Sequence, residues 1–573
     1  MEEQTIMKKT NLAKLLALAV VSVMLLSSLV GCFGLLGGGG DETESDTVAD
    51  TNNTNNDTEG NKDTDKDTEA DEDTEDTEGD EETEGEESDA ESKETEAEET
   101  QPKETDTWGQ DVVTSTTQDQ DLNFGGAEVG IACRAEARYR REISMDTLEG
   151  DPLNMQIFLR NKAVESELNC KLKFIEADDL WGSEGRSIPN YVKTEYEAGT
   201  NSAVDVIFAN AAYTVHNDVR AYLQNLNADE MSYMDIDQPY WNQNYVKNAT
   251  CYDQLYYIIG DLTLTIYDKA MVNFVNFNML KSIGYQPSDI YDLIEDAEGN
   301  KNWTFDQFQT IVLEFTPEDT DGNYEVNRGD KVRVSSIYPS EALDGYFAAF
   351  ELEAIQTNDD GSHTITLDGN TKFADAATMM YNFYQLDGMY KVNDIHNTWN
   401  NFIDGNSLFH TDIIYRNADY NKQMRNVEFD YGILPLPMYD DSQLGYHTTS
   451  QDAYNAISVL NNKEDEFAMI SAYLDLMCAK SYSDVRPFYI EKMMKTEYAD
   501  DADSTRMIEI IMNGLTYDTG TIYSFQMNRV AMDTWRECAG KGTTLSERWA
   551  AIQTETIEAV RAFDMFFQAS QYM

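Results

Sequence analysis

The chain has 573 residues, with 107 acidic and 41 basic side chains and a formal net charge of −66. Nucleic acids and anionic lipid surfaces repel a chain of this charge, so we expect it to bind no nucleic acid. The length allows two to four domains.

An apolar stretch near the start, from about Leu15 to Val30, follows three lysines. A basic segment before a short apolar core is typical of a secretory signal. The stretch is short for a membrane-spanning helix, which needs ~20 apolar residues. It ends in "LVGC" at Cys32, which resembles the lipobox of bacterial lipoproteins. The resemblance implies a signal peptide over residues 1–32 and a lipid on Cys32; an uncleaved signal anchor with an incidental cysteine is the alternative.

The next segment is strongly acidic. From Asp41 to Asp121 it has 34 acidic residues, 4 lysines and few apolar side chains. Such a segment buries too little apolar surface to offset its chain entropy, so we expect residues 33–122 to form a disordered acidic linker. A flexible chain of ~80 residues reaches on the order of 50 Å. We interpret the linker as a tether through a cell wall; a low-complexity tail without a selected length is the alternative.

The body, residues 123–573, opens with alternating strand and helix patterns. "EVGIACR" predicts a strand, and Asp151 and Pro152 then mark the cap and first position of a helix. "CKLKFIEA" predicts a strand, "IPNYVKTEYEAG" a short helix and "VDVIF" a buried strand. Strands that alternate with helices predict an α/β fold with parallel pairs.

Later patterns in the body are increasingly helical. "MVNFVNFNML" predicts a strand running into a helix. "NWTFDQFQTIVLEF" predicts a helix opened by a capping box from Thr304 to Gln307, with Trp303 as a packing residue at its start. "EDEFAMISAYLDLMC" predicts an amphipathic helix.

The sequence offers little for catalysis or cross-linking. H-E-x-x-H, G-x-S-x-G and G-x-x-x-x-G-K-[ST] do not occur, so we expect no enzyme. Carboxylates are so numerous that some pair will lie at glycosidase distances by chance, which keeps a cell-surface polysaccharide hydrolase as an alternative. The body's cysteines form no C-x-x-C, so buried free thiols are favoured over a zinc site or a disulfide, for which Cys133 and Cys170 are the nearest candidates.

Several stretches of the body, taken in order, resemble one protein family: the extracellular solute-binding lipoproteins of bacterial ABC importers, of the carbohydrate type (family 1-like). Each stretch is a loose match alone, but their order behind a lipobox is specific. The stretches are "AVDVIFANAAY", "CYDQLYYIIGD", "VNFVNFNMLKSIGY", "NWTFDQF", "FIDGNSLFHTDIIYRN", "EFDYGILPLPMYDD" and "AISVLNNKEDEFAMISAYLDLM".

The resemblance implies a two-lobed, periplasmic-binding-protein-like α/β fold of type II, with lobes joined by crossing strands. Lobe 1 would comprise about 123–261 and 447–478, and lobe 2 about 262–446 and 479–573. It also implies a monomer on the outer face of the cytoplasmic membrane of a Gram-positive bacterium. This monomer would close on a solute and deliver it to ABC permease subunits. A solute sensor or adhesin on the same fold is the further alternative.

The resemblance also places a solute site at the cleft-facing strand ends. Sugar rings stack on aromatic rings while their hydroxyls need fixed polar partners, so an oligosaccharide suits a body rich in tyrosine and carboxylates. Tyr415 stands where family members often carry a stacking Trp, and for each tyrosine simple packing is the alternative. The predicted ligand-binding residues are Glu136, Arg138, Asn210, Tyr213, Asp261, Tyr415, Asp452, Tyr454, Tyr517 and Tyr523.

One further stretch, "DTDGNYEVNRGD", has clustered oxygen ligands of the kind that Ca²⁺ prefers. Asp319, Asp321, Asn323 and Asp330 occupy positions one, three, five and twelve of a calcium loop. Position six is Tyr324, where the loop needs glycine, so a turn without metal is favoured over a structural calcium site. We expect no other cofactor.

Overall fold

The structure is a computed structural model, and it describes most of the body. The predicted signal peptide with Cys32, nearly all of the predicted linker and Asp151 lie outside the described residues. Within the part that is described, no helix combines the length and the apolar character needed to cross a membrane. The described residues are 115, 117, 120–144, 152–177, 188–199, 202–215, 217–416, 424, 427–494 and 502–570.

Four strands form the first sheet, in the order β11-β3-β1-β2. β1 pairs in parallel with β2 and β3, and β11 runs antiparallel to β3. Parallel neighbours need a crossover connection, and helix α3 supplies it between β1 and β2. The strands and helices predicted for this region are confirmed: β1 (Ala127–Arg134), α3 (Pro152–Glu167), β2 (Cys170–Ala177), α4 (Ile188–Glu197) and β3 (Val206–Asn210). The fourth strand is β11 (Asn455–Val459), for which no prediction was made.

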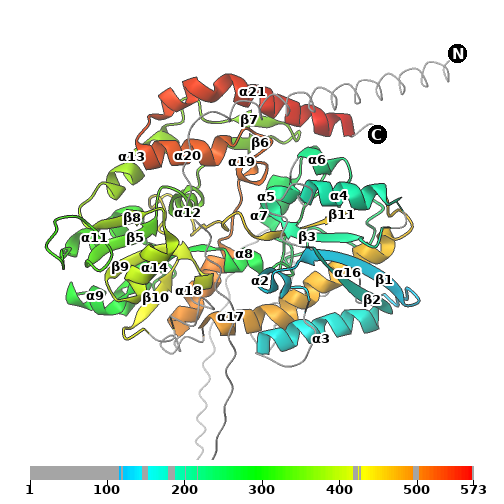
Figure 1. The fold of residues 1–573 in the computed structure, drawn as a ribbon, viewed down its shortest axis with the longest axis horizontal. Helices are drawn as coiled ribbons and strands as arrows, with labels where there is room; N and C mark the ends of the chain where they lie inside the picture. The colour runs from blue at the N-terminus through cyan, green and yellow to red at the C-terminus, as the bar shows by residue number, and fades with distance from the viewer. Residues whose placement is uncertain are drawn as a thin grey trace, which may run out of the picture. The chain divides into compact units, whose positions relative to one another are not determined.

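Five strands form the second sheet, in the order β10-β4-β9-β5-β8. β5 is parallel to β8 and β9, whereas β4 is antiparallel to β9 and β10. Figure 1 shows this sheet beside the first one, with helices packed around each. The predicted α/β class is therefore confirmed, with two mixed sheets. The strands are β4 (Met271–Asn276), β5 (Val332–Ile337), β8 (Met389–Val392), β9 (Ser407–Ile413) and β10 (Tyr431–Leu434).

Two helices of this region, α9 and α11, were predicted from the sequence and are confirmed. The Thr304 hydroxyl accepts a hydrogen bond from the Gln307 amide, which caps α11 as predicted. Trp303 is fully buried and donates its indole N–H to the Pro435 carbonyl at 3.0 Å, so its predicted packing role is confirmed. The helices are α9 (Phe277–Ser282), α10 (Pro287–Ile294), α11 (Phe305–Glu314), α12 (Glu341–Ala349), α13 (Thr371–Tyr384) and α14 (Ile395–Ile403).

Three segments of the chain pass side by side between the two sheets. Ala270 forms an isolated antiparallel bridge with Ser450, and Thr448 forms a parallel bridge with Leu515. The Met271 amide also donates to the Thr449 carbonyl at 3.1 Å. These contacts fix the segments around residues 270, 450 and 515 to one another.

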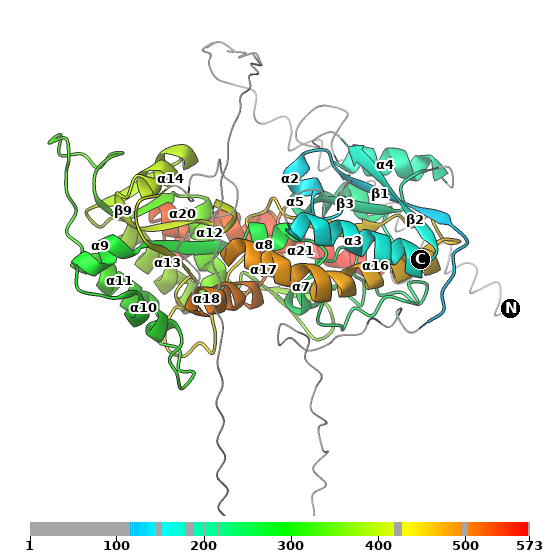
Figure 2. The ribbon, with the colours of Figure 1, turned by 90° about the horizontal axis from the view of Figure 1, so that it is seen from below.

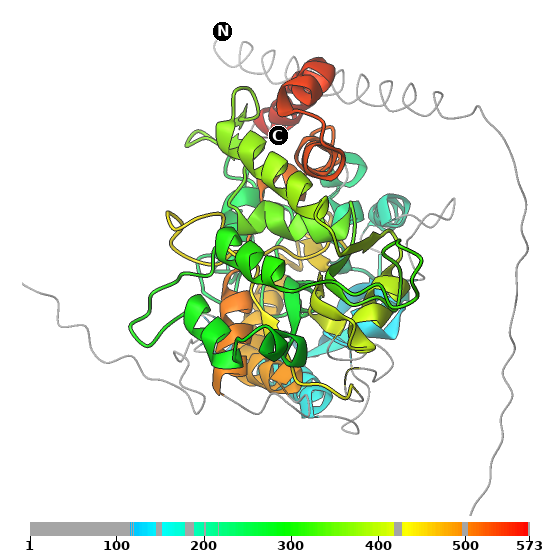
Figure 3. The same cartoon turned by 90° about the vertical axis from the view of Figure 1, so that its left-hand side faces the viewer.

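The C-terminal helices contact elements from both sheets. α20 packs on α12 and α13, and Figure 3 shows α20 together with α21 at one end of the body. The α21 rings of Phe563, Phe566 and Phe567 surround the buried Arg220 guanidinium at 4.2 to 5.0 Å. The helices are α16 (Phe467–Lys480), η3 (Ser481–Val485), α17 (Arg486–Met494), α18 (Ala502–Asn513), α19 (Thr519–Ile522), α20 (Val530–Lys541) and α21 (Leu545–Ser570).

Short elements connect these larger ones. β6 and β7 form a two-stranded antiparallel hairpin. The remaining elements are α2 (Ala137–Arg140), α5 (Ala211–Thr214), α6 (Asn217–Arg220), α7 (Gln243–Ala249), α8 (Thr265–Asp268), β6 (Ile355–Thr357) and β7 (His363–Ile365).

The prediction of an amphipathic helix over α16 is wrong. Every residue from Met469 to Ala479 is buried, including Asp475. The helix packs against α3 and η3, as Figure 2 shows for α3, and Ser115 and Thr117 of the predicted linker also reach it. Because neighbours surround it, α16 has no solvent-facing stripe.

The cysteine prediction is confirmed. Cys133, Cys170, Cys251, Cys478 and Cys538 are free and buried. Cys133 pairs with Glu176 and Cys170 with Ala127, so the two cysteines lie at opposite ends of the β1–β2 pair. Burial raises the pKa of both thiols to about 11, which keeps them protonated at neutral pH.

Gly130 lies where β1 passes very close to a neighbouring loop. Its amide donates to Asp205 Oδ2 at 2.7 Å, and an added Cβ would lie 1.7 Å from the Ala203 carbonyl oxygen. We therefore expect Gly130→Ala to lower the free energy of unfolding by about 2–3 kcal/mol in urea titrations, since the loop must shift. Gly445→Ala is the matched control, because its Cβ meets nothing within 4 Å. Equal stability of the two variants would contradict this packing.

Candidate functional site

A cavity of about 400 Å³ lies where the crossing segments pass between the two sheets. Its volume falls within the range of small-molecule sites, ~300–1,000 Å³. Ala211 and Ala212, directly after β3, line it from the first sheet, and α12 lines it from the second. Residues 449–452 and 516–518 of the crossing segments complete the wall. The cavity is therefore built from elements of both sheets.

Three tyrosines pack together along one wall of the cavity. The Tyr517 ring lies 5.3 Å from Tyr245 and 5.4 Å from Tyr454, between ring centroids. Tyr454 and Tyr517 line the cavity, although both are almost fully buried. This wall is therefore made of buried rings packed on one another.

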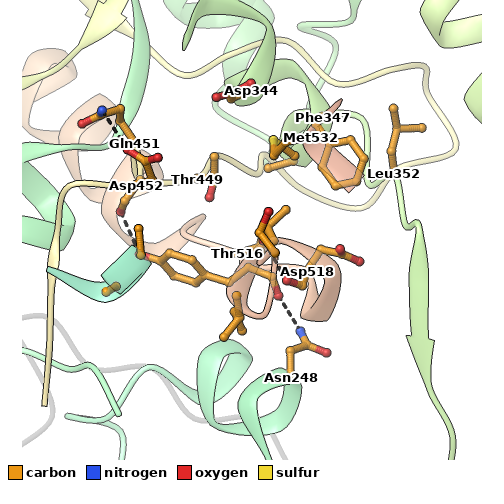
Figure 4. Close-up of a pocket in the computed structure, with 18 of the residues that line it drawn as sticks. Asn248, Asp344, Phe347, Leu352, Thr449, Gln451, Asp452, Thr516, Asp518 and Met532 are labelled. Atoms are coloured by element: carbon orange, nitrogen blue, oxygen red, sulfur yellow. Dashed lines mark hydrogen bonds between the residues drawn. The ribbon is translucent and has the colours of Figure 1, made fainter. Parts of the chain in front are cut away.

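Two asparagines of α7 hold the backbone of Tyr517. The Tyr517 amide donates to Asn244 Oδ1 at 2.6 Å, and its carbonyl accepts from Asn248 Nδ2 at 2.8 Å (Figure 4). The Tyr517 hydroxyl lies 2.7 Å from Ser450 Oγ. The crossing segment around residue 515 is therefore hydrogen-bonded to α7 and to the crossing segment around residue 450.

Phe525 is the most exposed aromatic ring of the cavity wall. Its side chain is 43% exposed, whereas Phe347 on the opposite side is buried. The Arg529 guanidinium lies 5.3 Å from the Phe525 ring centroid. An exposed ring beside a polar cluster is suited to stack on a flat apolar face of a ligand.

One ion pair and one histidine–carboxylate contact occupy the second-sheet side of the cavity. Arg536 donates two hydrogen bonds to Asp344, from Nε to Oδ1 at 2.8 Å and from Nη2 to Oδ2. Burial raises the pKa of the Asp344 carboxyl, and Arg536 opposes that shift. His447 Nε2 lies 2.9 Å from Glu351 Oε1, while the buried His447 Nδ1 makes no hydrogen bond with the described residues.

Asp518 is a half-buried acid at the edge of this cavity, and both of its carboxylate oxygens are shielded from solvent. Neither of its carboxylate oxygens has a hydrogen-bond partner of good geometry among the described residues. Burial, with the nearby Glu353 charge, raises the pKa of Asp518 to about 8, and neighbouring amides such as that of Gly520 offset this only in part. Burial also raises the pKa of Glu353, and Lys247 opposes the shift. Figure 4 shows Asp518 beside Thr516, across the cavity from Phe347.

The cavity brings together three of the predicted ligand-binding residues. Asp452, Tyr454 and Tyr517 line it. Asp452 is exposed and accepts a hydrogen bond from Gln451 Nε2 at 3.0 Å, which leaves it accessible to a ligand. These three residues come from crossing segments that are 63 or more positions apart in sequence.

Other predicted residues lie outside the cavity wall. Tyr523 is fully buried and donates to the Ala249 carbonyl at 2.5 Å. Asp261 is buried and accepts from the Tyr267 hydroxyl at 2.7 Å. Tyr415 is buried with the Arg141 guanidinium 5.2 Å from its ring centroid.

The last four predicted residues follow the first and third strands. Asn210 ends β3 and its Oδ1 accepts from the Ala212 amide at 3.0 Å, next to the cavity but not in its wall. Glu136 is exposed at the start of α2 and does not line the cavity. The side chains of Arg138 and Tyr213 lie outside the described residues.

Sequence reasoning missed Phe525, Asp518, Glu353 and Arg529, which line the cavity. The segment that contains Asp518, Phe525 and Arg529 has little strand or helix periodicity, so nothing in its sequence shows which residues turn inward. The sequence indicated this segment only indirectly, because the predicted ligand-binding residues Tyr517 and Tyr523 lie in it.

The Asp319–Asp330 loop brings three carboxylates together, with one oxygen of each within 4.8 Å of the others. These carboxylates already accept hydrogen bonds from their own loop: Asp319 from the Gly322 and Tyr324 amides, and Asp330 from the Thr320 amide. Tyr324, at the position that needs glycine, has φ 66°. The hydrogen bonds account for the turn by themselves, and the preference for a turn without metal over a calcium site stays a prediction.

Comparison with solved structures finds matches over about three quarters of the chain, and three of them illustrate the low sequence identity. An uncharacterized protein, lmo0859 of Listeria monocytogenes, is 11% identical, with a TM-score of 0.49 over 76% of this chain and 100% of its own. The galacto-N-biose/lacto-N-biose I-binding protein of a Bifidobacterium longum ABC transporter is 12% identical, with a TM-score of 0.46 over 77% and 98%. Maltose-bound MalE3 of T. maritima is 11% identical, with a TM-score of 0.41 over 77% and 99%.

No protein-family model and no curated protein sequence matches the chain. The structural neighbours include carbohydrate-binding proteins of ABC transporters, the group that the sequence resembles. The chain itself has the α/β architecture with two mixed sheets, and a cavity where its crossing segments meet.

Proposed function

We propose that the chain is an extracellular solute-binding protein that captures a carbohydrate in the cavity between its two sheets. The observation that carries the proposal is the composition of the cavity wall. It combines an exposed ring, Phe525, with carboxylates and amides from several elements, the combination that a sugar ring and its hydroxyls require.

Hinge closure is the mechanism that the wall supports. Residues of α5 and α7 on one side and of α12 on the other face the same cavity, so one solute touches groups of both sheets. A solute that contacts both sides stabilises the closed state relative to the open one. In the proposal, Cys32 carries the lipid, residues 33–122 form the tether, and the closed state docks on an ABC permease.

A binding panel tests this function. The full chain would be titrated with neutral mono- and oligosaccharides while its melting temperature is followed. A ligand at 100 times its dissociation constant adds ~2.7 kcal/mol, which raises the melting temperature by roughly a few degrees. A shift with the sugar recovered intact supports a binding protein; degradation of the sugar would instead support the hydrolase alternative, and no shift with any sugar would contradict the proposal.

Phe525→Ala should weaken sugar binding about tenfold, because one stacked ring contributes ~1–1.5 kcal/mol. Isothermal titration of the variant measures this. Phe525 is partly exposed, so its loss should change stability little. Tyr324→Ala removes a ring that is 95% exposed and outside the cavity, and it serves as the control. Unchanged affinity in Phe525→Ala would show that this ring does not contact the sugar.

A further inference from the structure

Asn244 and Asn248 lie one turn apart on α7, and both line the cavity. Side chains four positions apart share one face of a helix, with their Cβ atoms ~5–6 Å from each other. Each asparagine uses one end of its amide to hold the Tyr517 backbone. Asn244 Oδ1 accepts from the Tyr517 amide at 2.6 Å, and Asn248 Nδ2 donates to the Tyr517 carbonyl at 2.8 Å.

These two contacts decide which end of each asparagine remains for a ligand. A backbone N–H only donates and a backbone C=O only accepts, so neither side-chain amide can be turned end for end without losing its bond. Within the described residues, the Asn244 NH2 group and Asn248 Oδ1 have no hydrogen-bond partner, and neither is sealed from solvent. Figure 4 shows Asn248 Oδ1 on the side away from Tyr517. The helix α7 thus offers the cavity one donor group and one acceptor.

Support of the crossing segment around residue 515 is the competing explanation for these asparagines. It accounts for Asn244 Oδ1 and Asn248 Nδ2, which hold Tyr517, but not for the other end of either side chain. A carboxylate oxygen would accept from the Tyr517 amide equally well, so the support role does not require the Asn244 NH2 group.

We propose that the captured carbohydrate carries an acetamido group, as N-acetylhexosamines do, and that Asn244 and Asn248 bind this group. The inference rests on the proposed function, a carbohydrate site in this cavity, and adds a substituent of the solute. A secondary amide is planar, with its N–H and C=O on opposite edges. Its carbonyl accepts from Asn244 Nδ2 while its N–H donates to Asn248 Oδ1. A hydroxyl offers one atom for both contacts, whereas the acetamido group offers a separate atom for each.

The methyl end of an acetamido group needs an apolar neighbour, and α19 supplies one beside α7. The two helices pack together, and Thr519 Oγ1 of α19 donates to the Asn248 carbonyl at 3.0 Å. Ile522 of α19 lines the cavity. This part of the wall therefore combines the polar pair with an apolar side chain, as a site for an acetamido group requires.

The test compares sugars with the forms in which acetamido groups replace the 2-hydroxyls. The pairs are glucose and N-acetylglucosamine, galactose and N-acetylgalactosamine, mannose and N-acetylmannosamine, and cellobiose and N,N′-diacetylchitobiose. Each sugar is titrated calorimetrically into the full chain at neutral pH. In at least one pair the acetamido sugar should bind about tenfold or more tightly, since a site built for polar groups rejects a solute that leaves them unpaired.

Asn244→Asp should remove this preference. The new carboxylate keeps an acceptor for the Tyr517 amide but places a second acceptor where the donor group was, opposite the acetamido carbonyl. Its affinity for the parent hexose should change less than about threefold, which shows that the cavity is intact. Asn278→Asp is the matched control, because it makes the same substitution at an exposed residue of α9 outside the cavity, and it should keep the full preference.

Equal affinities within every pair, or a preference that survives in Asn244→Asp, would overturn the inference and leave the carbohydrate function standing. Binding of other neutral sugars alone, with none of these probes bound at ~20 mM, would overturn it as well. If no sugar binds at all, the proposed function itself is contradicted.

Discussion

Asp475→Ala should lower the free energy of unfolding by about 3–5 kcal/mol, since a hydrogen bond to a charged group contributes ~1.5–3 kcal/mol. Asp475 lies inside α16 and accepts hydroxyl hydrogen bonds from Ser115 at 2.6 Å, Thr117 at 2.7 Å and Tyr240 at 2.5 Å. All four residues are buried. The substitution leaves these hydroxyls without their acceptor and opens a space in a helix that is enclosed on all sides.

Urea titration followed by circular dichroism measures this loss. Asp484→Ala is the control, because Asp484 is an exposed acid in the adjoining η3 and should change stability by less than ~0.5 kcal/mol. The result also bears on the linker: Ser115 and Thr117 belong to the predicted tether, so Asp475 fixes where that segment joins the body. A loss below ~1 kcal/mol would show that this network is not formed.

Asp518→Asn should make the protein more stable at high pH, which is unusual for a substitution in a proposed binding site. The pKa of Asp518 is about 8 in the folded chain, against the ordinary value of 3.8. Between these two values the unfolded chain loses the proton while the folded chain keeps it, so folding becomes less favourable as the pH rises. Asparagine removes this cost, which amounts to about 3–5 kcal/mol above pH 8.

Glu142→Gln provides the contrast. Glu142 is also a buried acid, and burial raises its pKa to about 7. Unlike Asp518, it accepts hydrogen bonds from Asn455 Nδ2 at 2.6 Å and from the Thr265 amide at 2.8 Å. The side-chain NH2 group of a glutamine would face one of these N–H donors instead of accepting from it. This variant should therefore gain little stability or lose some.

Unfolding of both variants at pH 5.5 and pH 8.5 tests the argument. The gain in the free energy of unfolding of Asp518→Asn over the unmodified chain should be about 2 kcal/mol at pH 5.5 and should be larger at pH 8.5. Equal effects at the two pH values would contradict the burial of Asp518 as an acid.

The sequence predicted the parts of the fold that depend on local patterns. β2 matches "CKLKFIEA" residue for residue, and α11 begins directly after its predicted cap, Thr304. Such elements are specified by alternation, capping and β-branched residues within a few positions. The prediction for α16 was wrong because its surroundings are set by α3, η3 and Asp475 contacts that local periodicity does not contain.

The cavity was harder to predict than the fold. Its wall gathers residues from α5 to α20, and whether a tyrosine faces the cavity depends on neighbours far away in sequence. Tyr517 and Tyr523 look alike in sequence, yet Tyr517 lines the cavity while Phe563 of α21 covers Tyr523 at 4.7 Å between ring centroids. Asp518 gave no signal, because its burial results from the packing of three crossing segments.

Hydrogen exchange of the full chain, with and without a sugar that raises its melting temperature, tests the central claim most directly. If the solute binds in the cavity and closes it, amides in residues 447–454 and 515–529 should exchange more slowly, together with those of α7 on the first-sheet side and of α12 on the second-sheet side. These segments line the cavity from the crossing region and from the sides of both sheets. Protection confined to other surfaces, or to one sheet alone, would contradict capture of the solute between the two sheets.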